Sequence, residues 1–208
     1  MKTDILPAQN PEAQSRALAV LHSGGLVAFP TDTVYGVGAL AFNAAAVSSI
    51  YAAKDRSVEK AIPVLIADPA DLAKVTLEVS DAATRLATRF WPGPLTLVVL
   101  KHPLLPETIS ASPTVGVRVP DHPVARALLR AAGPMAVTSA NLSGQPSPST
   151  AEEVFTQLGG RIALIIDGGK APGGVSSTVV DCVGREARIL RLGPVSEDEI
   201  RAVLGQDL

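Results

Sequence analysis

Cysteines, clustered histidines and long apolar runs are scarce in this chain, and each shortage excludes a class of structure. The single cysteine, Cys182, excludes an internal disulfide bond. The three histidines lie far apart and no CxxC pair is present, so the sequence has none of the ligand spacings of a zinc site. We therefore predict that the protein side chains hold no metal ion.

No apolar run reaches the roughly 20 residues that a membrane-spanning helix needs. The longest runs are strand-sized, as in residues 162–166. The opening residues, MKTDILPAQNPEAQ, also lack the apolar segment of a signal peptide. From these features we expect a soluble, cytoplasmic protein with no membrane partner.

Aromatic residues make up 3% of the chain, and the net charge is −2 with a pI of about 5.9. The overall charge therefore offers no general attraction to nucleic acid, and any basic site has to be local. Hydrophobic residues make up 47% of the 208 residues, which is enough to form the core of one large domain spanning 1–208.

Short aliphatic runs alternate with amphipathic segments, which predicts an α/β fold. Helices are expected over 11–23, 44–56, 80–90 and 121–133, and capping-box patterns predict further helix starts at Thr150 and Ser196. Strands are expected over 26–29, 62–67, 95–100, 114–120, 135–139, 161–167, 177–183 and 187–193. The last two strands resemble a hairpin, so we predict a twisted sheet that is mixed rather than purely parallel.

Polar residues gather in four stretches at the ends of predicted elements, where ligands of open α/β sheets tend to bind. These stretches are PTDTVYG (30–36), KDRSVEK (54–60), TVGVRVP (114–120) and TSANLSGQPSPST (138–150). Two further candidates lie outside them, SSTVVD (176–181) and Arg191. Each stretch also has a purely structural interpretation, such as a turn, a helix C-terminus or a solvated strand face. No P-loop, dinucleotide fingerprint or nucleophile elbow is present.

Taken in order, FPTDTVYGVG, KDRSVEK, FWPGPLTLVV, VGVRVPDHP, TSANLSGQPSPST, STVVD and ILRLG resemble the YrdC-like domain of threonylcarbamoyl-AMP synthases. The resemblance covers residues 12–204 and is closest to the short, single-domain form of the family. It implies a twisted α/β sheet with a concave, locally basic face. It also implies that L-threonine, bicarbonate and ATP are converted to threonylcarbamoyl-AMP and pyrophosphate, with Mg²⁺ arriving on ATP.

The resemblance implies a role for each of eleven residues. Arg118, Thr33 and Ser177 would contact L-threonine, and Lys54, Arg56 and Arg118 would be catalytic through charge stabilisation. The residues that would bind ATP are Lys54, Arg56, Lys60, Thr114, Ser139, Asn141, Ser149 and Arg191. The chain departs from the family where Ala61 follows the third basic position and where Leu65 stands in place of a frequent histidine, which puts one substrate contact in doubt.

The resemblance also implies partners. A separate transferase complex would use the product to modify adenosine in tRNA, so that contact with tRNA itself is indirect. Three alternatives remain open: an RNA-binding module using the same concave face, a carbamoyl-transfer role as in longer hydrogenase-maturation proteins, and an α/β domain whose site has decayed. An RNA-binding module would need stacking aromatics as well as basic residues, and aromatics are few here.

Overall fold

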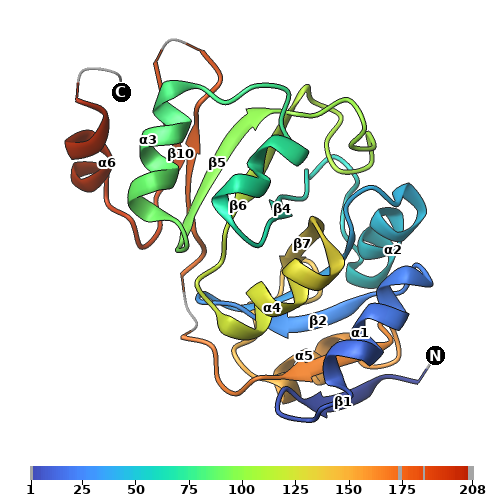
Figure 1. Ribbon diagram of the computed structural model, residues 1–208. Helices are drawn as coiled ribbons and strands as arrows, with labels where there is room; N and C mark the ends of the chain where they lie inside the picture. Colours follow the sequence, from blue (N-terminus) through green and yellow to red (C-terminus); the bar gives the residue numbers. More distant parts are fainter. Residues whose placement is uncertain (1, 173–174, 185, 206–208) are drawn as a thin grey trace.

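The computed structural model describes residues 2–172, 175–184 and 186–205. Within these residues ten strands form one sheet in the order β1-β8-β2-β3-β7-β4-β6-β5-β9-β10 (Figure 1). Parallel and antiparallel neighbours both occur, and the last pair, β9 with β10, is an antiparallel hairpin. The predicted mixed α/β sheet is therefore confirmed.

The strands are short, and most match the predicted apolar runs. Their bounds are β1 Asp4–Pro7, β2 Val27–Pro30, β3 Tyr35–Leu40, β4 Val64–Leu65, β5 Leu95–Leu100, β6 Thr114–Arg118, β7 Met135–Ser139, β8 Leu164–Asp167, β9 Thr178–Asp181 and β10 Arg188–Arg191. The side chains of strand β6 alternate between the two faces of the sheet, because Val115 and Val117 are buried in the core while Gly116 and Arg118 lie on the opposite face.

Six α-helices and one 3₁₀ helix connect the strands within the described residues. They are α1 Ala13–His22, α2 Ala44–Lys54, η1 Pro69–Lys74, α3 Asp81–Phe90, α4 Pro123–Ala132, α5 Ala151–Leu158 and α6 Glu197–Leu204. Asn43 and Ser80 accept hydrogen bonds from the first turns of α2 and α3, and Ser196 forms the predicted capping box with Glu199. Thr150 also caps its helix, but the carboxylate of Glu153 binds the amide and hydroxyl of Ser149.

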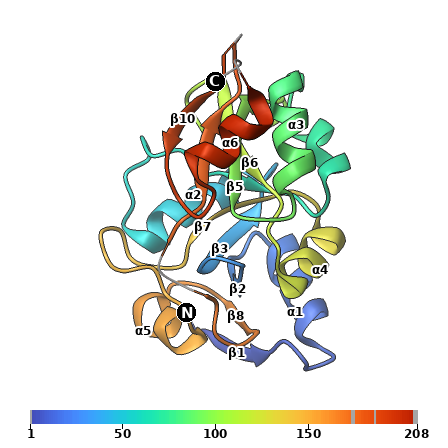
Figure 2. The same cartoon turned by 90° about the vertical axis from the view of Figure 1, so that its left-hand side faces the viewer.

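Helices cover both faces of the sheet. Val27 and Phe29 point from β2 into a cluster with α1 and α4, while Ala28 points into the larger core on the other face, which includes residues of α2, α3 and α5. At the far end of the sheet α3 and α6 pack side by side (Figure 2). Phe29 pairs with Gly36 of β3, so Gly36 continues the face that α1 and α4 cover. That face extends beyond these helices toward β7, β4 and β6.

The main omission of the sequence prediction is β3, since no strand is expected there between residues 29 and 62. Residues Tyr35–Leu40 instead form a central strand between β2 and β7. Gly36 and Gly38 fit this strand because a Cβ at either position would lie 2.7 Å from a methyl group of Val137. Glycine here allows close packing of strands rather than a turn.

Three smaller predictions also differ from the structure. Strand β4 has only two residues, because Pro63 cannot donate to a ladder and Ile62 bonds instead to Ile109. Strand β1 and the 3₁₀ helix η1 were not predicted. Helix α4 begins at Pro123, two residues later than predicted, with His122 at its N-cap. Among the described helices, none combines the length and apolarity needed to cross a membrane.

Candidate active site

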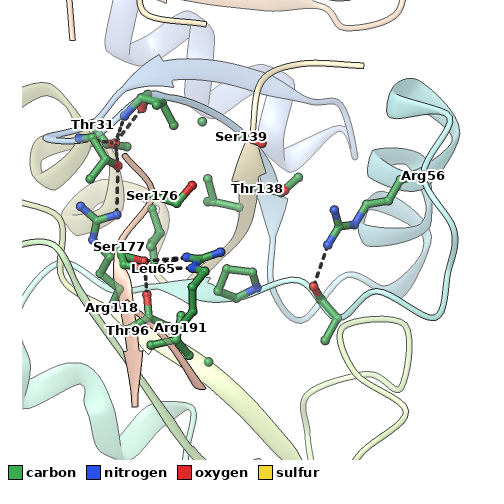
Figure 3. A pocket seen from close by; sticks show the side chains of 18 residues that line it. Thr31, Arg56, Leu65, Thr96, Arg118, Thr138, Ser139, Ser176, Ser177 and Arg191 are labelled. Carbon is green, nitrogen blue, oxygen red and sulfur yellow. Dashed lines mark hydrogen bonds between the residues drawn. The ribbon is translucent and has the colours of Figure 1, made fainter. Parts of the chain in front are cut away.

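A cleft of about 350 Å³ opens on the sheet face that Gly36 continues (Figure 3). Its walls come from strands at both halves of the sheet and from the loops that follow β2, α2 and β8. The lining residues are Thr31, Thr33, Val34, Gly36, Arg56, Ala61, Pro63, Leu65, Thr96, Gly116, Arg118, Val137, Thr138, Ser139, Ser176, Ser177, Val179 and Arg191. Six of these eighteen were predicted from the sequence: Thr33, Arg56, Arg118, Ser139, Ser177 and Arg191.

Arg118 forms the most constrained corner of the cleft. It is 6% exposed, and its Nε donates to the carbonyl of Gly93 at 2.9 Å. One terminal nitrogen donates to Thr33 Oγ1 at 3.1 Å and the other to Asp32 Oδ1. Thr33 is in turn 3.0 Å from the hydroxyl of Thr31. The arginine is therefore pre-positioned, and these three bonds within the described chain leave two of its five N–H groups unused.

Asp32 supplies the counter-charge at this corner. Its side chain is largely buried beside Arg118, and its second oxygen, Oδ2, is buried with no hydrogen-bond partner among the described residues. A buried carboxylate is costly unless paired, so the ion pair with Arg118 fixes both groups in place.

Arg191 reaches the cleft from β10, near the C-terminal end of the described chain. Its Nε and Nη2 donate to the carbonyl of Ser177 at 3.2 and 2.8 Å, and Ser177 Oγ lies 2.8 Å from Thr96 Oγ1 (Figure 3). Burial lowers the pKa of Arg191, and the positive charge of nearby Arg118 lowers it further. Two like charges are thus held close together, which favours an anion between or beside them.

Arg56 enters the cleft from the opposite side (Figure 3). Asp55 ends α2 in a left-handed conformation with φ of 50°, which turns the chain sharply at the residue before Arg56. The guanidinium donates to the carbonyls of Lys60 at 3.3 Å and Ala61 at 3.0 Å. Burial lowers the pKa of this arginine too.

The charge of the cleft is unbalanced. Three guanidinium groups line it, and of these only Arg118 forms an ion pair with a carboxylate within the described part of the chain. Arg56 and Arg191 bind backbone carbonyls and the Ser177 hydroxyl instead. An anionic ligand would supply the missing counter-charge, and arginine suits phosphate and carboxylate groups because its N–H groups can bind them in pairs.

Lys54 lies outside the cleft lining. It is 1% exposed, and its Nζ donates to the carbonyls of Ser139 and Asn141, while its own carbonyl accepts from the amide of Ser143 at 2.8 Å. The side chain therefore holds the SAN segment (residues 139–141) from beneath. A direct contact with phosphate, which the resemblance implies, would require this ammonium group to leave its two carbonyl partners.

Burial, together with the charge of Arg56, lowers the pKa of Lys54 to about 8 from its ordinary value of 10.5. Between these two pH values only the unfolded chain keeps the proton. We expect the unfolding free energy of the wild type to rise with pH across this window by up to about 3 kcal/mol relative to Lys54→Met. Urea denaturation of both proteins at several pH values measures this difference, and parallel pH profiles would contradict it.

The four remaining predicted residues also lie outside the cleft lining. Lys60 is exposed, and Thr114 shares a hydrogen bond with Ser112 at the start of β6. Asn141 is buried, and its amide nitrogen donates to two carbonyls of its own loop, although Oδ1 has no partner among the described residues. Ser149 lies in a separate groove and bonds to Glu153. Their contacts with ATP stay predictions.

The sequence analysis assigned no ligand role to Thr31 or Thr96. It also did not predict that apolar side chains form the floor of the cleft. Pro63, Leu65 and Val137 form part of this floor. The alternation of β6 did contain one usable signal, since it places Gly116 on the same face as Arg118. Thr96 gave a weaker signal, as a single hydroxyl within the apolar strand LTLVVL.

Cys182 is buried outside the cleft, and burial raises the pKa of its thiol to about 12. The thiol therefore stays protonated at neutral pH and is a poor nucleophile. We expect Cys182→Ser to keep the turnover and Michaelis constants of the wild type, with a small loss of thermal stability. Steady-state kinetics alongside a melting curve measure both, and a well-folded but inactive variant would contradict the expectation.

Within the described residues no group of three or more histidine, cysteine, aspartate or glutamate side chains is placed to hold a metal ion. The cleft lining itself contains no carboxylate and no aromatic residue. Its chemistry is that of guanidinium groups, hydroxyls and a small apolar floor.

Comparison with known proteins gives this geometry a context. A family model for Sua5, YciO and YrdC proteins, described as telomere recombination, matches residues 19–193. The threonylcarbamoyl-AMP synthase of Bacillus subtilis (strain 168) is 46% identical over 206 residues, covering 98% of this chain and 59% of that protein. A putative threonylcarbamoyl-AMP synthase of Mycobacterium tuberculosis (strain CDC 1551 / Oshkosh) is 42% identical over 210 residues, covering 99% and 97%.

Solved structures agree in fold. The crystal structure of P. abyssi Sua5 complexed with L-threonine has a TM-score of 0.93 and 39% identity, and the match covers 100% of this chain and 62% of that one. E. coli YciO has a TM-score of 0.84 and 27% identity, with 96% and 100% covered. The chain thus spans less than two thirds of the B. subtilis and P. abyssi proteins. Because the family model and these relatives match most of its length, the chain belongs to the Sua5/YciO/YrdC family.

Proposed function

We propose that this protein is a threonylcarbamoyl-AMP synthase, a nucleotidyltransferase that uses L-threonine, bicarbonate and ATP. The observation that supports this most directly is the excess of guanidinium groups in the cleft. Arg56, Arg118 and Arg191 come from three separate segments and face one cleft whose lining contains no carboxylate, although the whole chain has a net charge of −2. Of the three, only Arg118 forms an ion pair with a carboxylate of the described chain. A triphosphate and an amino-acid carboxylate are ligands of the complementary charge.

The proposed reaction has two steps. The amine of threonine attacks the carbon of bicarbonate, so that a carbamate forms and water leaves. A carbamate oxygen then attacks the α-phosphorus of ATP, and the bond to the bridging oxygen breaks to release pyrophosphate. Neither step needs a protein nucleophile, so the enzyme has to hold the reactants in line and stabilise the charge that develops.

Each corner of the cleft suits one part of this task. Arg118 and Thr33 form a pre-positioned pair with unused N–H groups, which suits the carboxylate of threonine. Arg56 and Arg191 bind no carboxylate of the described chain and suit the phosphates. Ser139 also lines the cleft (Figure 3).

Mg²⁺ would be held by phosphate oxygens and water, because the cleft lining contains no carboxylate that could bind it. When bound with ATP it would neutralise phosphate charge alongside Arg56 and Arg191. The product would be taken up by a separate transferase that modifies tRNA. The RNA-binding alternative lacks support, since the lining residues include no aromatic side chain on which bases could stack.

Pyrophosphate release from ATP with bicarbonate, measured with and without L-threonine, tests the proposal. Serine and valine are the controls, because serine lacks the methyl group of threonine and valine lacks the hydroxyl. We expect release that depends on threonine. A folded protein that binds ATP and threonine but releases no pyrophosphate would contradict the proposed activity of this chain.

Thr33→Ala removes a hydroxyl that accepts a hydrogen bond from Arg118 and lies 3.0 Å from Thr31. We expect the Michaelis constant for threonine to rise by about tenfold, since one hydrogen bond to a charged group contributes at least about 1.5 kcal/mol. The Michaelis constant for ATP should change little. Thr33→Ser, which keeps the hydroxyl, is the matched control, and an unchanged threonine constant in the alanine variant would remove Thr33 from the site.

A further inference from the structure

Thr96 is a cleft residue to which neither the motifs nor the comparisons assign a role. It lies on β5 within an otherwise apolar strand, is 6% exposed, and points into the cleft beside Ser177 (Figure 3). Gly116 on the neighbouring strand makes room for it, because a Cβ there would come within 3.0 Å of the Thr96 methyl group. A larger residue at position 116 would therefore crowd the Thr96 side chain.

The Thr96 hydroxyl has one hydrogen-bond partner in the described structure, Ser177 Oγ at 2.8 Å. Ser177 in turn binds Arg191 through its carbonyl, at 2.8 and 3.2 Å, and through its hydroxyl at 3.4 Å. The backbone is also closely packed here, since a Cβ at Gly193 would lie 2.3 Å from the carbonyl oxygen of Ser176. A chain of contacts thus runs from β5 through the start of β9 to the arginine on β10.

The direction of the Thr96–Ser177 hydrogen bond decides what Ser177 can do. A hydroxyl has one proton to donate and two lone pairs that accept. Arg191 already donates to Ser177 Oγ. If Thr96 donates as well, both lone pairs are used and the Ser177 proton is free for an anionic ligand. If Ser177 donates to Thr96, that proton is unavailable to the ligand.

We propose that Thr96 is a positioning residue that donates to Ser177, frees the Ser177 proton for an anionic ligand and steadies Arg191 against the like charge of Arg118. Thr96 itself does not need to touch the reacting atoms. The inference builds on the proposed function, in which Ser177 and Arg191 bind the anionic substrates, but its test depends only on binding.

The test compares Thr96→Val, which has the same shape without the hydroxyl, with Thr96→Ser, which keeps the hydroxyl. Calorimetry measures the dissociation constants of ATP, pyrophosphate and L-threonine for the wild type, both variants, Ser177→Ala and the double variant Thr96→Val/Ser177→Ala. Thr76→Val is the control for losing a buried threonine hydroxyl elsewhere, since Thr76 Oγ1 bonds to the carbonyls of Glu78 and Leu100.

We expect Thr96→Val to weaken at least one of the three ligands by about tenfold, as the loss of one hydrogen bond implies. Thr96→Ser should stay within about twofold of the wild type, and the double variant should bind no more weakly than Ser177→Ala alone, because the effect of Thr96 passes through Ser177. Thr76→Val should lower the melting temperature without changing the three constants.

Three results would overturn the inference: equal binding by Thr96→Val and the wild type, equal weakening in Thr96→Val and Thr96→Ser, or additive losses in the double variant. The first would show that the hydroxyl is unnecessary, the second that keeping the hydroxyl does not preserve binding, and the third that Thr96 acts independently of Ser177. A wild type that binds ATP and threonine but releases no pyrophosphate would contradict the proposed activity. The dissociation constants of the variants would still show whether Thr96 positions Ser177.

Discussion

Arg118→Met is expected to destabilise the protein by about 3–5 kcal/mol and to abolish threonine-dependent pyrophosphate release. The loss of stability follows from Asp32, whose carboxylate would stay buried with neither oxygen paired to a cation. The loss of activity follows from the proposed role of Arg118, because the N–H groups that would bind the threonine carboxylate and the contact with Thr33 would be gone. Urea denaturation and the pyrophosphate assay measure the two effects separately.

A second substitution separates the two causes. Adding Asp32→Asn to Arg118→Met removes the unpaired charge, so we expect part of the lost stability to return while activity stays absent. Arg126→Met is the matched control, since Arg126 pairs with Asp68 away from the cleft and Arg130 still neutralises that carboxylate. Full activity in the double variant would show that Arg118 has only a structural role.

Arg56→Ala is expected to lower the turnover number by about a thousandfold, the upper range for removing one group that stabilises a developing charge. The folded state should lose no more than about 1 kcal/mol, because Arg56 is half-buried and gives up only hydrogen bonds to two carbonyls that water can replace. Single-turnover measurements at saturating ATP isolate the chemical step.

Two controls sharpen this result. Arg56→Lys keeps a positive charge but loses the fork of N–H groups, so we expect an intermediate rate. Arg201→Ala removes an exposed arginine of α6 that pairs with Glu197, and it should leave the rate unchanged. Near-normal turnover of Arg56→Ala would remove this arginine from the proposed catalytic residues.

Much of the fold follows from patterns between residues that are close in the chain. The caps at Asn43, Ser80 and Ser196 lie beside the helices they begin, and the alternation of β6 needs only five consecutive residues. Strand β3 could not be recognised in the same way, because its glycines are explained by Val137, a residue about a hundred positions away on β7.

In the candidate site, too, the sequence predicted some features and not others. The motifs that carry the family resemblance identified the three arginines and three of the seven hydroxyl side chains that line the cleft. They did not reveal where a side chain points at the end of an element. Lys54 and Arg56 stand two residues apart, yet one lies beneath the SAN segment and the other faces the cleft.

The sequence by itself determined the α/β class, most of the elements and the chemical character of the site. Three features required the tertiary structure: which predicted residues share one cleft, the pairing of Arg118 with Asp32, and the contact between the hydroxyls of Thr96 and Ser177. The two groups of features differ in how far apart in the sequence the interacting residues lie. Helix caps and strand alternation depend on neighbours in the chain, whereas the burial and pairing of a long polar side chain depend on strands that meet only when the sheet is assembled.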